Sequence, residues 1–221
     1  MRPLHERLLT EIHLERQRLS RRKLLAGSAR LAGGAALATT VGLAPSPVSI
    51  RHQAAAQAMS SLDVLNYALT LEHLTHAFYR DGLGRFTFGA DSRGASIDAN
   101  LAAIRDHEQA HVEALTQAIT GLGGEPVAEA EYDFGDASAG PAAFLATAMA
   151  LENTGVRAYD GAAQYLDDPD FLTTVGSIVA VEARHASYLN LLNGQVPFPG
   201  AFERPLTQAE ALAIADRYVK A

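Results

Sequence analysis

An internal duplication is the feature of this sequence that most restricts its fold. The segment Ala-Leu-Thr-Leu-Glu-His at 68–73 parallels Ala-Met-Ala-Leu-Glu-Asn at 148–153, with an offset of 80 positions. Farther along, Asp-His-Glu-Gln-Ala-His at 106–111 parallels Ala-Val-Glu-Ala-Arg-His at 180–185, with an offset of 74 positions. Because the two offsets differ only slightly, the difference falls in loops. The chain therefore has two similar halves, each with a Leu-Glu segment followed by a Glu-x-x-His segment.

The duplicated segments lie in runs whose apolar residues recur at helical spacing. Ser60 followed by Asp63 predicts the start of the first helix, and Gly82 with Gly84 predicts its end. Similar signals predict long helices at about 96–120, 141–166 and 168–193, and a short last helix at about 207–219. No stretch alternates with period two for long enough to predict a strand. The predicted fold class is therefore all-α.

Residues 121–140 link the second and third predicted helices without a helical pattern, which is long for a turn. Fully extended, a segment of this length spans roughly 66 Å. The second helix, in contrast, is only about 37 Å long. The linker can therefore run the length of a bundle and begin the third helix beside the start of the second. This predicts a four-helix bundle of two antiparallel hairpins joined by one long crossover, with a short C-terminal helix after it.

Acidic and histidine side chains of these helices are candidate metal ligands. Positions i and i+3 share one helix face, so the Glu and His of each Glu-x-x-His segment can point at one centre. Four carboxylates that face a common core repel one another and lose hydration, and two divalent cations remove both costs. The chain has no cysteine, which excludes thiolate ligands and disulfides. The candidate ligands are Glu72, Glu108, His111, Glu152, Glu182 and His185.

A lone Glu from each of two helices, with Glu-x-x-His from each of the other two, is the arrangement of di-iron and di-manganese bundles. With these motifs, residues 60–193 resemble the ferritin-like superfamily, most closely its desiccation-related, ferritin-like-domain subgroup. The resemblance implies a ferritin-like four-helix bundle that holds two Fe or Mn ions. It also implies a role for each candidate: Glu108 and Glu182 bridge the ions, Glu72 and Glu152 are terminal ligands, and His111 and His185 each bind one ion.

Other polar residues near the candidate ligands have more than one interpretation. Tyr79 and Tyr159 each follow a candidate glutamate by seven residues. Each phenol is either a hydrogen-bond partner of a ligand carboxylate or an ordinary core side chain. His76, one turn beyond the first candidate ligand, is either an additional ligand or, as we expect, a packed or exposed side chain. His73 and His107 adjoin candidate glutamates and are expected to point away from the centre, at the surface.

A carboxylate-bridged pair of Fe or Mn ions favours an oxidoreductase of the ferroxidase, peroxidase or manganese-catalase-like kind. The expected partner is a small-molecule oxidant, peroxide or dioxygen, or Fe(II). Without a Cys-x-x-Cys unit of the rubredoxin type, electrons would come from Fe(II) or from peroxide itself. The alternative is a non-catalytic protein of oxidative or desiccation stress that is structural or stores metal. A homo-oligomer is compatible with either function.

The first 58 residues have the features of an export signal and linker. Arg21 and Arg22, which precede a weakly apolar run, resemble a twin-arginine signal and predict use of the twin-arginine export machinery. The best cleavage site follows Ala58, which predicts export to the periplasm, the cell envelope or the exterior. The alternative is an uncleaved signal that anchors the chain in a membrane. Arg30 inside the apolar run weakens that alternative, because a charge at the bilayer centre costs about 3 kcal/mol.

Charge divides the chain in the same place. Residues 1–58 carry nine Lys and Arg against three acidic residues, a net charge of +6, and residues 59–221 carry nine against 22, a net charge of −13. Because the strongly acidic segment 59–221 repels the phosphate backbone of nucleic acids, we expect no nucleic-acid partner. No long apolar stretch follows residue 60, so a membrane is a partner only through an uncleaved signal. The expected domains are the export signal and linker at 1–58, the four-helix bundle at 59–194 and a C-terminal extension at 195–221.

Overall fold

The computed structural model describes residues 59–166 and 168–220, so the predicted export signal and its cleavage site lie outside the described residues. The four long helices are α3 (Ser61–Gly82), α4 (Ile97–Gly121), α5 (Pro141–Ala163) and α6 (Pro169–Leu192). A 3-10 turn, η1 (Gly135–Ser138), precedes α5, and the short helix α7 (Gln208–Ala215) follows α6. The described part of the chain holds no strand. The predicted all-α fold is confirmed.

The helices begin where the sequence carries capping residues. Ser60 and Asp63 exchange hydrogen bonds in a capping box at the start of α3. Thr207 begins α7 in the same way, and the Asp168 carboxylate accepts the hydrogen bond that caps α6. Each capping side chain satisfies a backbone N–H that has no partner within its helix.

Two helices end earlier than predicted: α5 at Ala163 rather than near 166, and α7 at Ala215 rather than near 219. Beyond α7, Val219 forms an isolated antiparallel bridge with Tyr132, and the Lys220 N–H donates to the carbonyl of Glu131. Residues 219 and 220 thus pair through their backbone with residues 131 and 132 instead of forming helical hydrogen bonds, and α7 ends before them.

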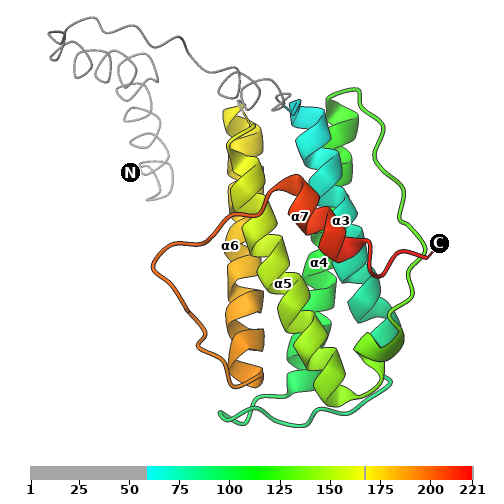
Figure 1. Ribbon diagram of the computed structural model, residues 1–221, viewed down its shortest axis with the longest axis vertical. Helices are drawn as coiled ribbons and strands as arrows, with labels where there is room; N and C mark the ends of the chain where they lie inside the picture. Colours follow the sequence, from blue (N-terminus) through cyan, green and yellow to red (C-terminus); the bar gives the residue numbers. More distant parts are fainter. Residues whose placement is uncertain (1–58, 167, 221) are drawn as a thin grey trace, which may run out of the picture. The chain divides into compact units, whose positions relative to one another are not determined.

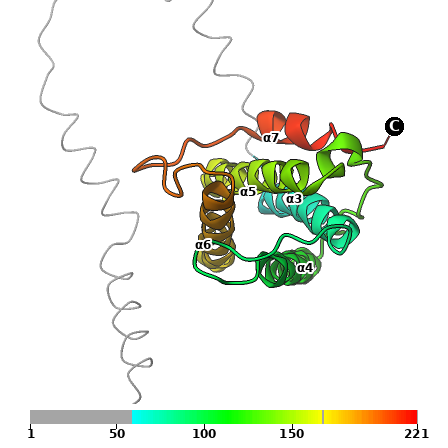
Figure 2. The same cartoon turned by 90° about the horizontal axis from the view of Figure 1, so that it is seen from below.

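The four long helices form two antiparallel hairpins, α3 with α4 and α5 with α6, and the hairpins pack through α3 against α5 (Figures 1 and 2). The segment between α4 and α5 runs along α3. Near the start of α3, the Asn66 side chain donates to the Glu125 carbonyl and accepts from the Val127 N–H. Near its end, Arg80 pairs with Glu129 at 2.8 Å. The predicted long crossover between two hairpins is confirmed.

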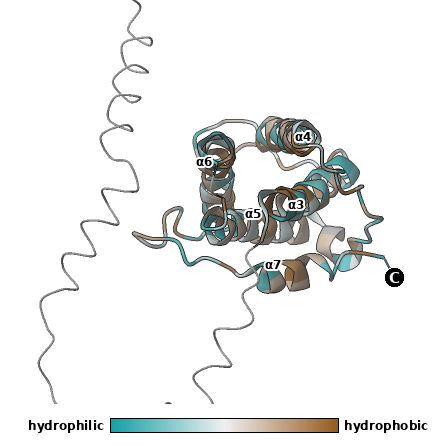
Figure 3. Ribbon diagram, turned by 90° about the horizontal axis from the view of Figure 1, so that it is seen from above, coloured by the Kyte–Doolittle hydropathy of each residue, from teal (hydrophilic) through white to brown (hydrophobic). Residues whose placement is uncertain are grey.

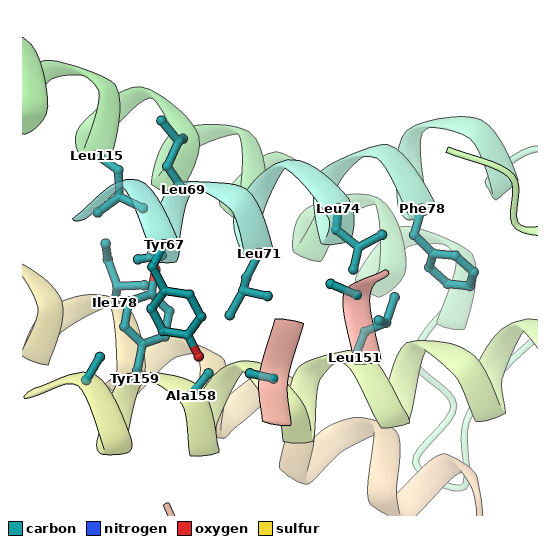
Figure 4. Close-up of a cluster of buried hydrophobic side chains, with 14 of the residues drawn as sticks. Tyr67, Leu69, Leu71, Leu74, Phe78, Leu115, Leu151, Ala158, Tyr159 and Ile178 are labelled. Carbon is teal, nitrogen blue, oxygen red and sulfur yellow. The ribbon is translucent and has the colours of Figure 1, made fainter. Parts of the chain in front are cut away.

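Apolar side chains join the two hairpins along the bundle axis. Figure 3 shows apolar segments on α3, α4 and α6 in the view down the bundle. In the core, Tyr67 of α3 extends toward Ala158 of α5 (Figure 4). Nearer the end of α3, Phe78 stacks on Phe144 of α5, with ring centroids 4.5 Å apart. Gly82 makes this packing possible, because a Cβ there would lie only 2.3 Å from the Phe144 ring.

Helix α7 of the C-terminal extension packs on α3 and α5, on the side of these helices away from α4 and α6 (Figure 2). The Leu206 N–H donates to the Arg157 carbonyl of α5 at 2.9 Å. A Cβ at Gly161 would lie 1.9 Å from the Leu206 carbonyl oxygen, so this contact requires glycine. Within the described residues, no helix combines the length and the apolarity needed to cross a bilayer.

Candidate metal centre

The six side chains singled out as candidate ligands lie together in the interior of the bundle. Each of the four helices contributes at least one of them, and all are buried, with exposed fractions from 0% for Glu108 to 8% for His111. Their ligand atoms form two groups, each with all atoms within 4.8 Å of one another. The first group is Glu72, Glu108, His111 and Glu182, and the second is Glu108, Glu152, Glu182 and His185.

The two imidazoles occupy opposite sides of the cluster. Nδ1 of His111 lies 3.3 Å from Glu72 Oε2 and 3.0 Å from Glu182 Oε1. Nδ1 of His185 lies 3.1 Å from Glu108 Oε1 and 3.3 Å from Glu152 Oε2. Glu108 and Glu182, which belong to both groups, therefore lie between the two histidines.

Burial and mutual repulsion set the protonation of the cluster without metal. Loss of hydration, followed by repulsion from neighbouring carboxylates, raises the pKa of Glu108 and of Glu182 well above the ordinary glutamate value. Burial opposes a charged His111, but contacts with Glu108 and Glu182 outweigh it and raise the pKa of His111 to about 12. The pKa of His185 is also raised against burial, chiefly by its contact with Glu152. Protons therefore supply positive charge among the carboxylates.

The buried cluster atoms that lack an aligned hydrogen-bond partner fit a pair of cations. Glu72 Oε2, both oxygens of Glu108, Glu182 Oε1 and Nδ1 of His111 are buried and have no well-aligned hydrogen-bond partner. Several of these atoms lie 3.0–3.3 Å from one another, so they are close but poorly oriented for hydrogen bonds. Buried polar atoms without aligned hydrogen-bond partners are costly in a protein core, and divalent cations that displace the protons would satisfy them. The buried Glu and His groups could therefore bind a metal pair.

Two tyrosines hold carboxylates of the opposite hairpin. The Tyr79 hydroxyl of α3 donates to Oε1 of Glu152 on α5 at 2.7 Å. The Tyr159 hydroxyl of α5 donates in turn to Oε1 of Glu72 on α3. Each phenol is buried, and burial is the first cause that raises the pKa of both tyrosines well above the ordinary value. Both hydroxyls therefore stay protonated and leave the second oxygen of each carboxylate turned toward the cluster.

Replacing Tyr79 with phenylalanine is expected to lower the free energy of unfolding by about 1–3 kcal/mol, because Glu152 Oε1 loses its donor in a buried site. Denaturant unfolding measures the change. Tyr188→Phe is the matched control, because its hydroxyl accepts from Asn100 in a half-buried position where water can replace it. Equal decreases in the free energy of unfolding for the two variants would mean that the buried hydrogen bond to Glu152 stabilises the fold no more than a half-buried one.

Among the other histidines of the described residues, His76 agrees with expectation, whereas His73 and His107 differ from it in part. His73, expected at the surface, is half-buried, and its Nε2 lies 3.2 Å from the Val127 carbonyl oxygen because the crossover covers it. His76 belongs to neither ligand group. Burial, aided by the Arg80 charge, lowers the pKa of His76. His107 is exposed as expected, but its ring reaches inward, and its Nδ1 lies 2.9 Å from Nε2 of His185.

Gly155 lies beside the cluster, although the sequence patterns did not single it out. It lies on α5, and a Cβ there would lie 3.1 Å from Glu182 Oε2. In the duplication, the equivalent position on α3 is Thr75. The missing side chain leaves space beside one of the two carboxylates shared by the ligand groups. The only signal in the sequence is that one half has glycine where the other has threonine.

Comparison with known proteins agrees with this geometry. Curated proteins give no significant match to the chain. A sequence model of the ferritin-like domain matches residues 60–195, which covers the four long helices and all six candidate ligands. With its helical bundle and its buried Glu and His cluster, the chain belongs to the ferritin-like domain family.

Proposed function

We propose that this protein is an exported member of the desiccation-related subgroup that holds two Fe or Mn ions. Its proposed activity is redox chemistry on peroxide, dioxygen or Fe(II) during oxidative or desiccation stress. The observation that carries the proposal is the buried pair of ligand groups that share Glu108 and Glu182. A core with four carboxylates and two imidazoles is costly to keep without cations, which favours a resident metal pair over a purely structural interior.

The donor set narrows the identity of the metal. All candidate donors are carboxylate oxygens and imidazole nitrogens, which suit Fe and Mn equally well. We propose that Glu108 and Glu182 serve both ions, that Glu72 and His111 complete one position, and that Glu152 and His185 complete the other. Two such ions, when bound, supply two-electron redox chemistry with oxygen species.

The chain's own residues would prepare the site in two ways. The phenols of Tyr79 and Tyr159 fix the orientation of the terminal carboxylates, so that one oxygen of each faces the metals. Burial of the ligands keeps bulk water from competing for the ions. With no cysteine in the sequence, we propose that reducing equivalents come from the substrate, either Fe(II) or a second peroxide molecule.

Elemental analysis of protein purified from its own host, followed by turnover assays with hydrogen peroxide and with Fe(II), tests the function. We expect two Fe or Mn ions per chain and turnover that falls by about tenfold or more in Glu182→Gln. Glu113→Gln is the control, because Glu113 lies exposed on α4, outside both ligand groups, and accepts a hydrogen bond from Gln109. Two bound metals without turnover would favour the alternative of a structural or metal-storing stress protein.

Export is expected to depend on the paired arginines near the N-terminus. In a double Arg21→Lys and Arg22→Lys variant, precursor should accumulate in the cytoplasm, because lysine lacks the guanidinium fork. Cell fractionation and N-terminal sequencing measure this, and export should yield a mature protein that begins at Met59. Lysine at both Arg16 and Arg18 is the control that keeps the same charge count. Normal export of the first variant would indicate another route, and a precursor that stays in the membrane would indicate an uncleaved anchor.

A further inference from the structure

The contact between His107 and His185 has the geometry of a directed hydrogen bond. His107 lies on α4, exposed and immediately before Glu108, and His185 lies buried on α6. Nδ1 of His107 and Nε2 of His185 are 2.9 Å apart, the ring planes differ by only 8°, and the ring centroids are 5.2 Å apart. With so short a distance between the nitrogens, this centroid separation means that the parallel rings meet edge to edge. The lone pair and the N–H of an imidazole lie in its plane, so they point along the contact.

The inner nitrogen of His185 decides which ring carries the shared proton. Nδ1 of His185 faces the oxygens of Glu108 and Glu152 inside the cluster. To bind a cation there, Nδ1 must offer a lone pair, so a neutral His185 must carry its proton on Nε2. That N–H then donates to Nδ1 of His107, which leaves the His107 proton on its outer nitrogen. When a cation is bound, the contact therefore supports the tautomer that metal binding requires, and it also fixes the plane of the ring.

Among the described residues, the other half of the cluster has no such partner. Under the duplication that relates 106–111 to 180–185, the position equivalent to His107 is Val181 on α6. A valine side chain has no nitrogen or oxygen, so it can accept no hydrogen bond from the ring of His111. The two ligand groups are therefore alike in their ligands and different in what orients their histidines.

We propose that His107 is a positioning residue that holds His185 ready for a cation and makes the two metal positions unequal. The group of Glu108, Glu152, Glu182 and His185 binds its ion more tightly than the group that contains His111. This inference rests on the metal binding in the proposed function, but on neither the identity of the metal nor catalysis.

Calorimetric titration of the metal-free full-length protein with Mn(II), at one fixed pH, tests the proposal. We expect two binding steps in the wild type and a 10–100-fold weaker first step in His107→Val, which copies the residue of the other half. His107→Asn should recover most of the affinity, because its side-chain oxygen can accept where Nδ1 does. His76→Val, which removes a histidine outside both ligand groups, should leave both steps unchanged.

The outcomes separate this inference from the function on which it rests. A wild type that binds no Mn(II), Fe(II) or Zn(II) would overturn both. Unchanged binding in His107→Val, or two equal steps in the wild type, would overturn the role of His107 alone. A loss of melting temperature in His107→Val with unchanged affinities would reduce His107 to a structural contact, which also contradicts the proposal.

Nuclear magnetic resonance of the Zn(II)-loaded, nitrogen-15-labelled protein gives a readout that does not depend on affinity. We expect the His185 Nε2 proton to show scalar coupling across the hydrogen bond to Nδ1 of His107. That coupling should disappear in His107→Val. If Nδ1 of His107 binds Zn(II) instead, it will show the shift of a metal-bound nitrogen and no such coupling, and the positioning role would be wrong.

Discussion

Chelation of the metal-loaded protein is expected to lower the melting temperature of the wild type by about 5–10 °C and that of Glu108→Gln by much less. Metal that binds only the folded state adds about 2.7 kcal/mol at a hundredfold excess over Kd. In a chain of this length, each kcal/mol shifts the melting temperature by about 2–4 °C. Glu108 belongs to both ligand groups, so its loss weakens both positions at once. Calorimetric melting with and without chelator measures the difference.

Two further variants make this experiment specific. Glu113→Gln removes an exposed carboxylate of the same helix and should keep the full shift of the wild type. Glu72→Gln, which alters a member of only one ligand group, should keep an intermediate shift. Equal shifts in the wild type and in Glu108→Gln would mean that the cluster holds no stabilising metal pair. The metal-free bundle itself should survive chelation, because protonated carboxyls are less costly to bury than charged ones.

The metal-free protein is expected to lose stability steadily as the pH rises from about 6.5 into the alkaline range. The folded state holds the proton of His111 up to a pKa of about 12, whereas an ordinary histidine releases it near 6.5. Below that lower value both states are protonated, and the stabilisation is fully present. Above it only the unfolded state releases the proton, so the free energy of unfolding falls by at most about 1.4 kcal/mol per pH unit for each such proton.

Other members of the cluster affect where this loss begins. Glu108, Glu182 and His185 also have raised pKa values and act in the same direction, with the glutamates contributing from lower pH. Glu72 acts oppositely. Its neighbour His111 outweighs the effect of burial and lowers the pKa of Glu72, so its contribution is lost only in acid.

Urea unfolding at a series of pH values, with and without metal, tests this dependence. Metal-loaded protein should show a much flatter profile, because the ions replace the protons. His111→Asn should remove part of the slope in the metal-free protein. Stability of metal-free wild type that increases with pH above 7 would contradict the prediction.

Much of the fold could be predicted because short-range signals mark the helix ends. The Ser60 and Asp63 pair and the Asp168 cap act within one helical turn, so they are readable without any tertiary context. The convergence of the candidate ligands followed from the duplication, since equal positions in two equal halves meet about the same centre. The early end of α7 could not be predicted, because it depends on pairing between Val219 and Tyr132, 87 positions apart.

The finer parts of the site depend on the spacing between helices, which the sequence does not encode locally. His107 lies one residue from Glu108 and therefore 100° around α4, which suggested a surface position. Its imidazole nevertheless contacts Nε2 of His185, because α6 lies near that side of α4. In the same way, helical spacing placed Tyr79 and Tyr159 near the cluster, but it could not show that each serves a carboxylate of the other hairpin.

The exchange of tyrosine hydrogen bonds between hairpins has a consequence for how the protein is made. Tyr79 reaches Glu152 across 73 positions of sequence, and Tyr159 reaches Glu72 across 87. Contacts across such long loops slow folding, because closing a loop costs chain entropy before the contact forms. During synthesis the first hairpin leaves the ribosome before α6 exists. Glu72, Glu108 and His111 then lack Glu182 of α6, the fourth member of their ligand group. Metal capture is therefore expected to await the last long helix, and the bound ion would come from the compartment in which that helix folds.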